Sequence, residues 1–556
     1  MTLSALLRQL IFKCYTTNLG AAAPFFLENF MQGMKMPSVM AHNFSQVPSA
    51  EIQRSSFKRS HSHKTCFDFG RLVPILCDEV LPGDTFNLKM SGFGRLATPL
   101  HPIMDNMYLD THFFFVPSRL VWDNFQKFMG EQTNPGDSTD YLVPTVAISG
   151  VGMTEGSIAD HFGLPIGVPN MQPFQSLPFR AYNLIWNEWF RDENLQDSLP
   201  VPRDDGPDSW TDLGYAGTVG GVLAPRGKRH DYFSSCLPFP QKGEAVSLPL
   251  GISSPISVDS GVSGVDIQIN DIADSSERLL DASQPNLKLG AVGTGSILFA
   301  DLTNATAATI NQLREAFQIQ RLLEKDARGG TRYAEILRSH FGVTSPDARI
   351  QRPEYLGGGS TPLRVTPVAQ TSSTDATSPQ GGLAGVGTVG FTGNGFSKSF
   401  VEHGYIIGLV SARADLTYQQ GVDRMWSRSD RFDYYWPSLA HLGEQAVFNN
   451  EIFAQGSSAD LNVFGYQERF AEYRFKNSLV TSRFRSNAAS SLDTWHLSQD
   501  FASLPVLGDT FIQENPPIDR CIAVPSEPHI IFDSYFDLTC ARPMPLYGVP
   551  GLIDHF

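Results

Sequence analysis

Apolar and polar residues alternate in short runs near both ends of this chain, which is the pattern of strands that bury one face. The segment TFNLKMS at 85–91 is one such run, inside a stretch, 65–117, where turns separate the expected strands. Further strands are expected at 400–418, 464–480 and 529–538. The sequence therefore predicts an antiparallel β core built from segments at both ends of the chain.

The composition excludes a disordered chain. Charged residues make up 18% of the 556 residues, below the roughly 25% of an average soluble domain, and aromatic residues reach 11%, with 39 Phe. Low charge with abundant Phe, Gly and Pro favours short strands, many turns and a surface that other subunits partly cover. The net charge of −15 argues against a wholly basic nucleic-acid coat but allows a local basic segment.

Between the β regions the sequence predicts helices and long loops. Apolar residues recur at helical spacing in 118–130, 180–192 and 305–341. Residues 240–303 are rich in Ser, Gly, Val and Asp, and we expect an exposed, β-rich insertion there. Residues 357–397 are expected to form a flexible Gly/Ser/Thr loop. Their GVGTVG segment matches a dinucleotide-binding pattern, but its flanks predict neither the strand nor the helix that such a site needs.

No residues of this sequence form a pattern typical of catalysis or metal binding. The six cysteines include no C-x-x-C pair, so neither a disulfide scaffold nor a structural zinc site is expected. His61 and His63 lack further ligands nearby, and the carboxylate pairs Asp78–Glu79 and Asp204–Asp205 resemble solvated turn residues. We therefore predict no catalytic residue, cofactor or metal ion, and neither a signal peptide nor a membrane span.

Residues 41–64 are interpreted as an extended arm with local positive charge. Its basic side chains are Arg54, Lys58, Arg59 and Lys64. Flexible cations can neutralise phosphates without reading bases, so these residues are candidates for nucleic-acid contact. A solubilising tail explains the same charges equally well. Residues 1–40, which precede the arm, are interpreted as an N-terminal extension that need not belong to the mature protein.

Several long strings of this sequence match, in order, those of one known protein family. They are HNFSQVPSAEIQRSSFKRSH (42–61), LPGDTFNLKMSGFGRLATPLHPIMDNMYLDTHFFFVPSRLVWDNFQKFMGEQTNP (81–135), INQLREAFQIQRLLEKDARGGTRYAEIL (310–337), GYQERFAEYRFKNS (465–478) and PMPLYGVPGLIDHF (543–556). In these strings the chain resembles the major capsid proteins of the microviruses (Microviridae), small bacteriophages with single-stranded DNA. The gokushovirus branch fits best.

This resemblance implies a mainly β fold, an eight-stranded antiparallel jelly roll over 65–556 with long inserted loops and several short helices. It also implies that about 60 copies assemble into a T = 1 icosahedral shell around circular single-stranded DNA, with 240–303 as a protrusion at the threefold axes. A jelly roll places its last strand beside its first and third. We therefore expect 529–538 to lie between 65–76 and 107–115.

The resemblance further implies four partners besides the other copies of the chain. These are the single-stranded DNA genome, a small basic DNA-binding protein, an internal scaffolding protein of the phage and a receptor on the bacterial host surface. It implies a structural protein rather than an enzyme, located in the virion and, during assembly, in the host cytoplasm, without membrane insertion. From the residues alone two other classes stay open, a carbohydrate-active enzyme on a β-sandwich and a phage carbohydrate-binding or receptor-binding β module.

Overall fold

The computed structural model of this chain describes residues 52–147, 150, 152–215, 219–246, 310–372, 374–375 and 379–548, and four short strands between 247 and 309. By its internal contacts the chain divides into two units, Met1–Gln53 and Arg54–Phe556, and every described helix and strand belongs to the second. The predicted extension 1–40, the first part of the predicted arm and most of the predicted insertion 240–303 lie outside the described residues.

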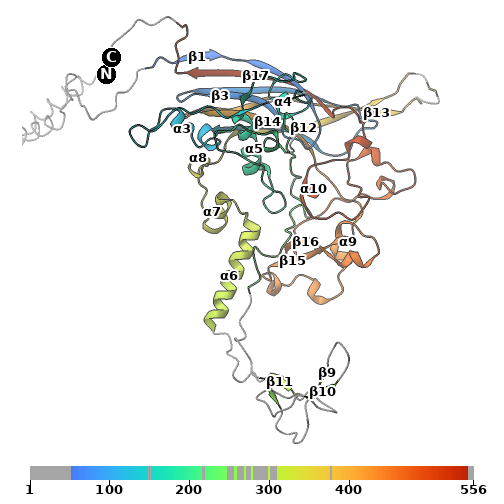
Figure 1. Ribbon diagram of the computed structural model, residues 1–556. Coiled ribbons are helices and arrows are strands. Elements are labelled where there is room, and N and C mark those ends of the chain that lie inside the picture. The colour runs from blue at the N-terminus through green and yellow to red at the C-terminus, as the bar shows by residue number, and fades with distance from the viewer. Residues whose placement is uncertain are drawn as a thin grey trace, which may run out of the picture. The chain divides into compact units, whose positions relative to one another are not determined.

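Nine strands form one antiparallel sheet in the order β1-β17-β4-β13-β12-β5-β14-β3, with β2 also paired to β17. Their bounds are β1 Ser55–Lys58, β2 His61–Phe67, β3 Val73–Val80, β4 Thr85–Leu96, β5 Met107–Pro117, β12 Glu354–Ala369, β13 Leu383–Ser399, β14 Gly404–Ala414 and β17 Ile530–Arg542. Because β1 and β2 follow one another along the same edge of β17, they occupy one position in the sheet. Figure 1 shows β1 and β17, which are far apart in the sequence, side by side.

The sheet curls so that two halves face each other across one core. One half contains β2, β17, β4 and β13, and the other contains β3, β14, β5 and β12. Phe400, which follows β13, has its ring centroid 5.7 Å from that of Phe86 on β4 and 4.6 Å from that of Phe115 on β5. Aromatic rings therefore connect the two halves. This strand order confirms the predicted mainly β fold with an eight-stranded jelly roll.

The last strand lies beside the first and the third strand of the jelly roll, but the third strand is not the expected one. β17 pairs with β2 on one side and with β4 on the other. The expected neighbour, 107–115, belongs to β5, which pairs with β12 and β14 instead. The prediction was wrong because 65–76 contains parts of two strands. The chain turns between them at Gly70, whose φ of +73° suits glycine. β3 is therefore the second strand of the jelly roll, β4 the third and β5 the fourth.

The flexible loop expected at 357–397 is also wrong, because these residues form most of β12 and β13. The glycines of this region allow the strands to lie close together. A Cβ on Gly395 would collide with a backbone carbonyl oxygen of β4, and one on Gly358 would collide with a carbonyl oxygen of β5. The GVGTVG segment lies within β13, so its glycines serve strand packing rather than a turn.

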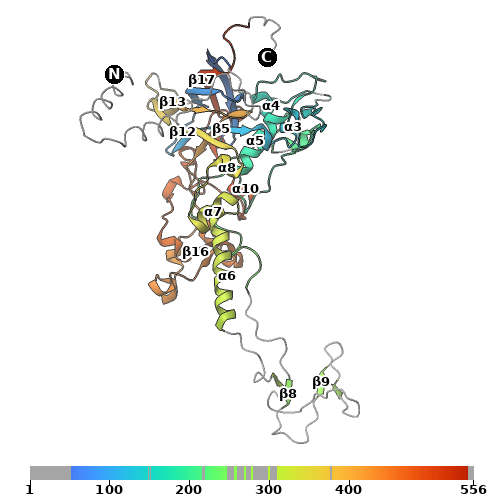
Figure 2. The ribbon, with the colours of Figure 1, turned by 90° about the vertical axis from the view of Figure 1, so that its left-hand side faces the viewer.

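The helices expected at 180–192 and 305–341 are confirmed with small shifts. α5 spans Leu177–Ile185 and continues as a π-helical turn, and Gly330 separates α6 (Ile310–Gly329) from α7 (Tyr333–Phe341). In Figure 2, α8 (Asp347–Ile350), α7 and α6 follow one another away from the sheet. Among the described residues, no helix has the length and apolar character to cross a membrane.

The helix expected at 118–130 is reduced to a short 3-10 turn and α3. The side chains of Val121 and Trp122 are fully buried, and the indole Nε1 of Trp122 donates a hydrogen bond to Asp205 at 2.7 Å. Burial of these two consecutive residues interrupts the regular helical stripe that the sequence predicts. The strand expected at 464–480 is confirmed only as far as Glu468, where β16 ends.

The remaining α-helices and the strands of the two small sheets outside 247–309 are short. They are α3 Phe125–Phe128, α4 Ile158–His161, α9 Asn449–Ile452, α10 Asp509–Ile512, β6 Thr145–Val146, β7 Phe174–Gln175, β15 Glu444–Phe448 and β16 Val463–Glu468. Within 247–309, β8 (Ile256–Val258) pairs with β11 (Leu298–Ala300), and β9 (Gln268–Asn270) pairs with β10 (Glu277–Leu279).

The two halves of the jelly roll differ in what covers their outer faces. β14 and β5 are buried along almost their whole length, because α5 packs against both strands. Tyr182 of α5 donates its hydroxyl to the carbonyl oxygen of Leu72 at 2.7 Å, which helps to fix the helix there. On β17, by contrast, buried and exposed residues alternate along the strand. The outer face of β1, β2, β17, β4 and β13, here called the open face, is therefore exposed to solvent.

Candidate nucleic-acid interface

The open face contains two of the four predicted cations, Lys58 on β1 and Lys64 on β2. The Nζ of Lys64 lies 2.8 Å from a carboxylate oxygen of Asp533, and the Nζ of Lys58 lies 4.0 Å from one of Asp537. All four side chains are more than half exposed. Exposed ion pairs of this kind contribute only about 0–1 kcal/mol each. Both lysines can therefore exchange a carboxylate partner for a phosphate at little cost in free energy.

The other two predicted cations make closer contacts within the protein. The Nη2 of Arg54 donates to the carbonyl oxygen of Gly83 at 2.6 Å and to the hydroxyl of Thr85 at 3.0 Å. The guanidinium of Arg59 makes two hydrogen bonds to the carboxylate of Asp78, at 2.7 and 2.9 Å. Burial opposes the charge of Arg59, but the hydrogen-bonded carboxylate raises its pKa above the ordinary value. The structure thus brings Lys58 and Lys64 onto one face and holds the two arginines in local contacts.

Two further cations of the open face escaped the sequence interpretation. Lys89 and Arg95 are exposed residues of β4 and lie opposite exposed positions of β17. With Lys58 and Lys64 they give this face four cations, against the carboxylates of Asp533 and Asp537. The alternation along β4 could have placed both on the solvent side of the strand, but not beside Lys58 and Lys64, because that placement depends on the pairing with β17. In a chain with a net charge of −15, the open face is a local positive surface.

A groove of about 590 Å³ lies within the open face. Its lining includes Ser62, Lys64, Ser91, Phe93, Gly390 and Tyr535. The register of the strands explains the hollow, because Phe93 lies beside Gly390, which has no side chain. Tyr535 lies between two small residues, Ser91 and Ser62. Phe93 and Tyr535 are 56% and 48% exposed, so the groove presents two accessible aromatic side chains next to hydroxyl groups.

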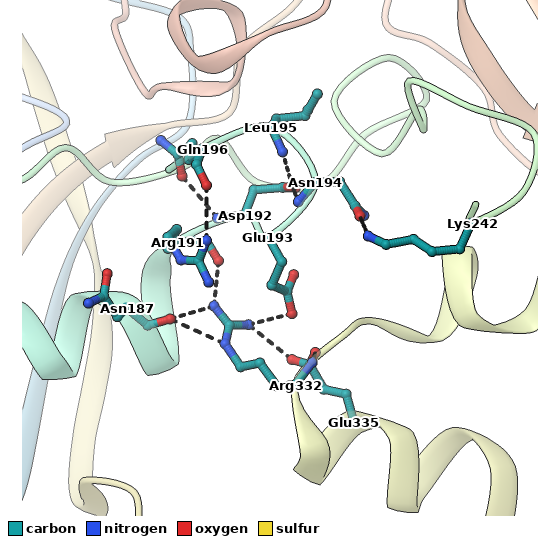
Figure 3. Close-up of polar contacts among 10 residues, drawn as sticks. All are labelled: Asn187, Arg191, Asp192, Glu193, Asn194, Leu195, Gln196, Lys242, Arg332 and Glu335. Atoms are coloured by element: carbon teal, nitrogen blue, oxygen red, sulfur yellow. Dashed lines mark hydrogen bonds and ion pairs between the residues drawn. The ribbon is translucent and has the colours of Figure 1, made fainter. Parts of the chain in front are cut away.

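A second polar cluster, centred on Arg332 at the start of α7, has a structural role. Its guanidinium donates to Glu193 at 2.8 Å, to Glu335 at 3.0 Å, and to the carbonyl oxygens of Asn187 and Arg191, both at 2.7 Å (Figure 3). The remaining N–H, at Nε, also donates to the carbonyl oxygen of Asn187. Because every donor is used within the protein, the cluster joins α7 to the segment that follows α5 and offers no Arg332 donor to a ligand.

Two common kinds of reactive group in proteins are metal sites and activated thiols. Within the described residues, no group of three or more His, Cys, Asp or Glu side chains could hold a metal ion. Cys521 is a buried free thiol, and burial raises its pKa to about 11, so this thiol remains protonated and weakly nucleophilic near neutral pH.

Comparisons with known proteins identify the family to which this chain is similar. The chain matches the family described as Capsid protein (F protein) over residues 45–552. It is 50% identical to the capsid protein VP1 of Bdellovibrio phage phiMH2K, over 93% of this chain and 98% of the relative. It is 46% identical to the capsid protein VP1 of Chlamydia phage 1, over 94% and 99%, and 37% identical to that of Spiroplasma virus 4, over 93% and 99%.

Proposed function

This chain belongs to the phage capsid protein (F protein) family and is a phage major capsid protein, and from this premise we propose how it builds a particle. About 60 copies close into a T = 1 icosahedral shell that encloses a circular single-stranded DNA genome. The carbohydrate-active enzyme and the receptor-binding module considered from the sequence are set aside, because relatives matched over nearly their whole length are capsid proteins.

Surface aromatic residues support contacts between copies. The segment between β14 and β15 carries Trp426, Phe432, Tyr434, Tyr435 and Trp436, each about half exposed or more. Aromatic and arginine side chains are enriched at the energetic centres of protein interfaces, and this segment also contains Arg424, Arg428 and Arg431. We expect a neighbouring copy to cover part of this surface in the shell.

The open face would hold the genome. Lys58 and Lys64, with Arg54 and Arg59 at its border, would neutralise phosphates without reading the base sequence. The observation that carries this proposal is the excess of cations on the open face, which none of the described helices covers. A small basic DNA-binding protein would neutralise further phosphates, and an internal scaffolding protein would guide assembly in the host cytoplasm.

The test compares the genome content of particles formed by a Lys58→Gln, Lys64→Gln double variant with that of wild-type particles. We expect less retained DNA and a weaker dependence of DNA release on salt, because counterion release scales with the number of phosphate contacts. Lys476→Gln is the matched control, since Lys476 is exposed, pairs with one carboxylate and lies outside the open face. Equal DNA retention in all three particles would remove this role from the two lysines.

The insertion 240–303 would carry host attachment, because a polar segment between strands can change without disturbing the jelly roll. Removing residues 247–303 leaves Lys242 in place, which donates to Asn194 at 2.8 Å. We expect particles of this variant to assemble, as measured by electron microscopy, and to lose binding to host cells. Loss of assembly, or unchanged binding, would contradict this assignment.

A further inference from the structure

We propose that the groove between Phe93 and Tyr535 binds unpaired nucleobases of single-stranded DNA by stacking. This inference rests on the proposed genome-binding role of the open face and names the part of DNA that the groove recognises. It adds to the lysines, which contact phosphates, a site that distinguishes unpaired from paired nucleic acid.

Phe93 and Tyr535 have no aromatic partner in the part of the chain that the structure describes. Among the described residues, ring contacts involve many core residues, such as Phe86 with Phe400, but none involves Phe93 or Tyr535. Solvent reaches both side chains, and neither stabilises the core in the way that the alternate, buried residues of β17 and β4 do. Exposed rings without partners are available platforms for another flat aromatic group.

The register of the strands sets the spacing of the platforms. Phe93 pairs with Asp533, and Tyr535 pairs with Ser91. Phe93 and Tyr535 are therefore diagonal neighbours on one face, about 7–8 Å apart. Gly390 leaves open the space on the other side of Phe93, since no heavy atom lies within 4 Å of a Cβ built there. A base can thus enter beside either ring without displacing a side chain.

The charges around the groove fit a polyanion with exposed bases. Lys64 and Asp533 line the groove as an exposed ion pair, and Arg95, two residues beyond Phe93 on the same face of β4, leaves an excess of one positive charge. The hydroxyls of Ser62 and Ser91 can donate to or accept from the edges of any base, so they impose little sequence preference. Base stacking on aromatic side chains is likewise tolerant of sequence, and it requires bases that are not already stacked in a duplex.

The experiment uses the unassembled full-length chain, separated from particles by size exclusion, and two fluorescent oligonucleotides with equal numbers of phosphates. One is oligo(dT), and the other carries abasic sites in place of the bases. Binding is measured by fluorescence anisotropy at fixed salt. We expect the wild-type chain to bind oligo(dT) about 5- to 150-fold more tightly than the abasic strand, as stacking of one base predicts.

Variants test whether the preference for oligo(dT) arises in the groove. Phe93→Ala and Tyr535→Ala should each reduce the preference for oligo(dT) while leaving the affinity for the abasic strand unchanged. Gly390→Val, which fills the hollow beside Phe93, should act in the same way without removing a ring. Ile531→Ala is the matched control, because Ile531 is an exposed apolar residue on the same face of β17 but has no aromatic ring. Circular dichroism checks that each variant is folded.

The outcomes distinguish failure of the stacking site from failure of the genome-binding role of the open face. Equal affinity of the wild-type chain for both oligonucleotides would overturn the stacking site and leave the phosphate contacts intact. A preference for oligo(dT) that survives in all three groove variants would also overturn it. Absence of binding to either strand would instead count against the genome-binding role of the open face, and with it against the groove as a DNA site.

Discussion

Arg180 of α5 forms a two-pronged ion pair with Asp208, with nitrogen–oxygen distances of 2.7 and 2.6 Å, and the two side chains are 0% and 2% exposed. The same guanidinium donates to the carbonyl oxygen of Val121 at 3.0 Å. Arg180 therefore connects α5, the helix that packs against β5 and β14, to two separate loops.

Loss of one partner of this pair should be costly. Asp208→Asn leaves a buried guanidinium without its charge partner, and we expect a loss of about 3–5 kcal/mol in the free energy of unfolding, measured by urea denaturation of the unassembled chain. Asp204 lies 3.5 Å from the same guanidinium but is 78% exposed. Asp204→Asn should therefore cost less than about 1 kcal/mol. Similar losses in the two variants would disprove the importance of burial here.

The carboxyl of Glu335 should make stability depend on pH. Burial raises the pKa of Glu335 from 4.5 to about 7, together with the hydrogen bond that its protonated carboxyl donates to Glu193 and the negative charge of Glu193. At a pH between these two pKa values the folded chain holds a proton that the unfolded chain releases. The contribution of Glu335 to stability therefore falls as the pH rises through this window. We expect the difference in unfolding free energy between Glu335→Gln and wild type to shift by about 1 kcal/mol in favour of the variant as the pH rises from 5 to 8. The shift is modest because Glu335 is partly exposed.

The measurement is the urea midpoint of both proteins at a series of pH values. Glu131→Gln, at an exposed glutamate, is the control for loss of a surface charge. A constant difference between Glu335→Gln and wild type across the pH range would show that Glu335 does not titrate in this window.

Two glycines of β13 should respond differently to the same substitution. Gly395→Ala forces a Cβ into a backbone carbonyl of β4, and we expect a loss of about 1–3 kcal/mol in unfolding free energy, as overpacking usually costs. Gly390→Ala adds a Cβ into open space on the same strand and should change stability by less than about 0.5 kcal/mol. Thermal unfolding compares the two, and equal effects would contradict the close approach of the strands at Gly395.

Trp426 should matter for assembly rather than for folding. Its side chain is 75% exposed, so Trp426→Ala should leave the unfolding free energy within about 0.5 kcal/mol of wild type. If a neighbouring copy covers it, the concentration needed to form particles, measured by light scattering, should rise several-fold. Trp426→Phe should restore part of the loss because it keeps an aromatic ring. Normal assembly of the Ala variant would place the subunit contact elsewhere.

The strands that alternate clearly could be predicted from the sequence, and the strands built around glycine could not. β4 and β17 bury every second residue, and this period is visible in the letters alone. β12 and β13 contain many glycines, whose role depends on carbonyl oxygens of other strands far away in the sequence. The turn at Gly70 could not be predicted either, because a single glycine between two apolar runs does not by itself indicate a turn.

Only two of the four cations of the candidate interface could be identified from the sequence. The cluster of basic residues drew attention to Lys58 and Lys64, because they are close together in the chain. Lys89 and Arg95 join them only through the pairing of β4 with β17, a register that links residues more than 400 positions apart. Likewise, nothing in the sequence indicates that Arg59 pairs with Asp78, which makes it a less available cation than its neighbours.

The position of β17 between β2 and β4 has a consequence for timing during synthesis. A ribosome makes β17 more than 400 residues after β2 and β4, so a nascent chain that still lacks β17 has a gap between these two strands. Such a chain cannot present finished contact surfaces to its neighbours. We therefore expect the strand order to delay assembly until β17 has been synthesised.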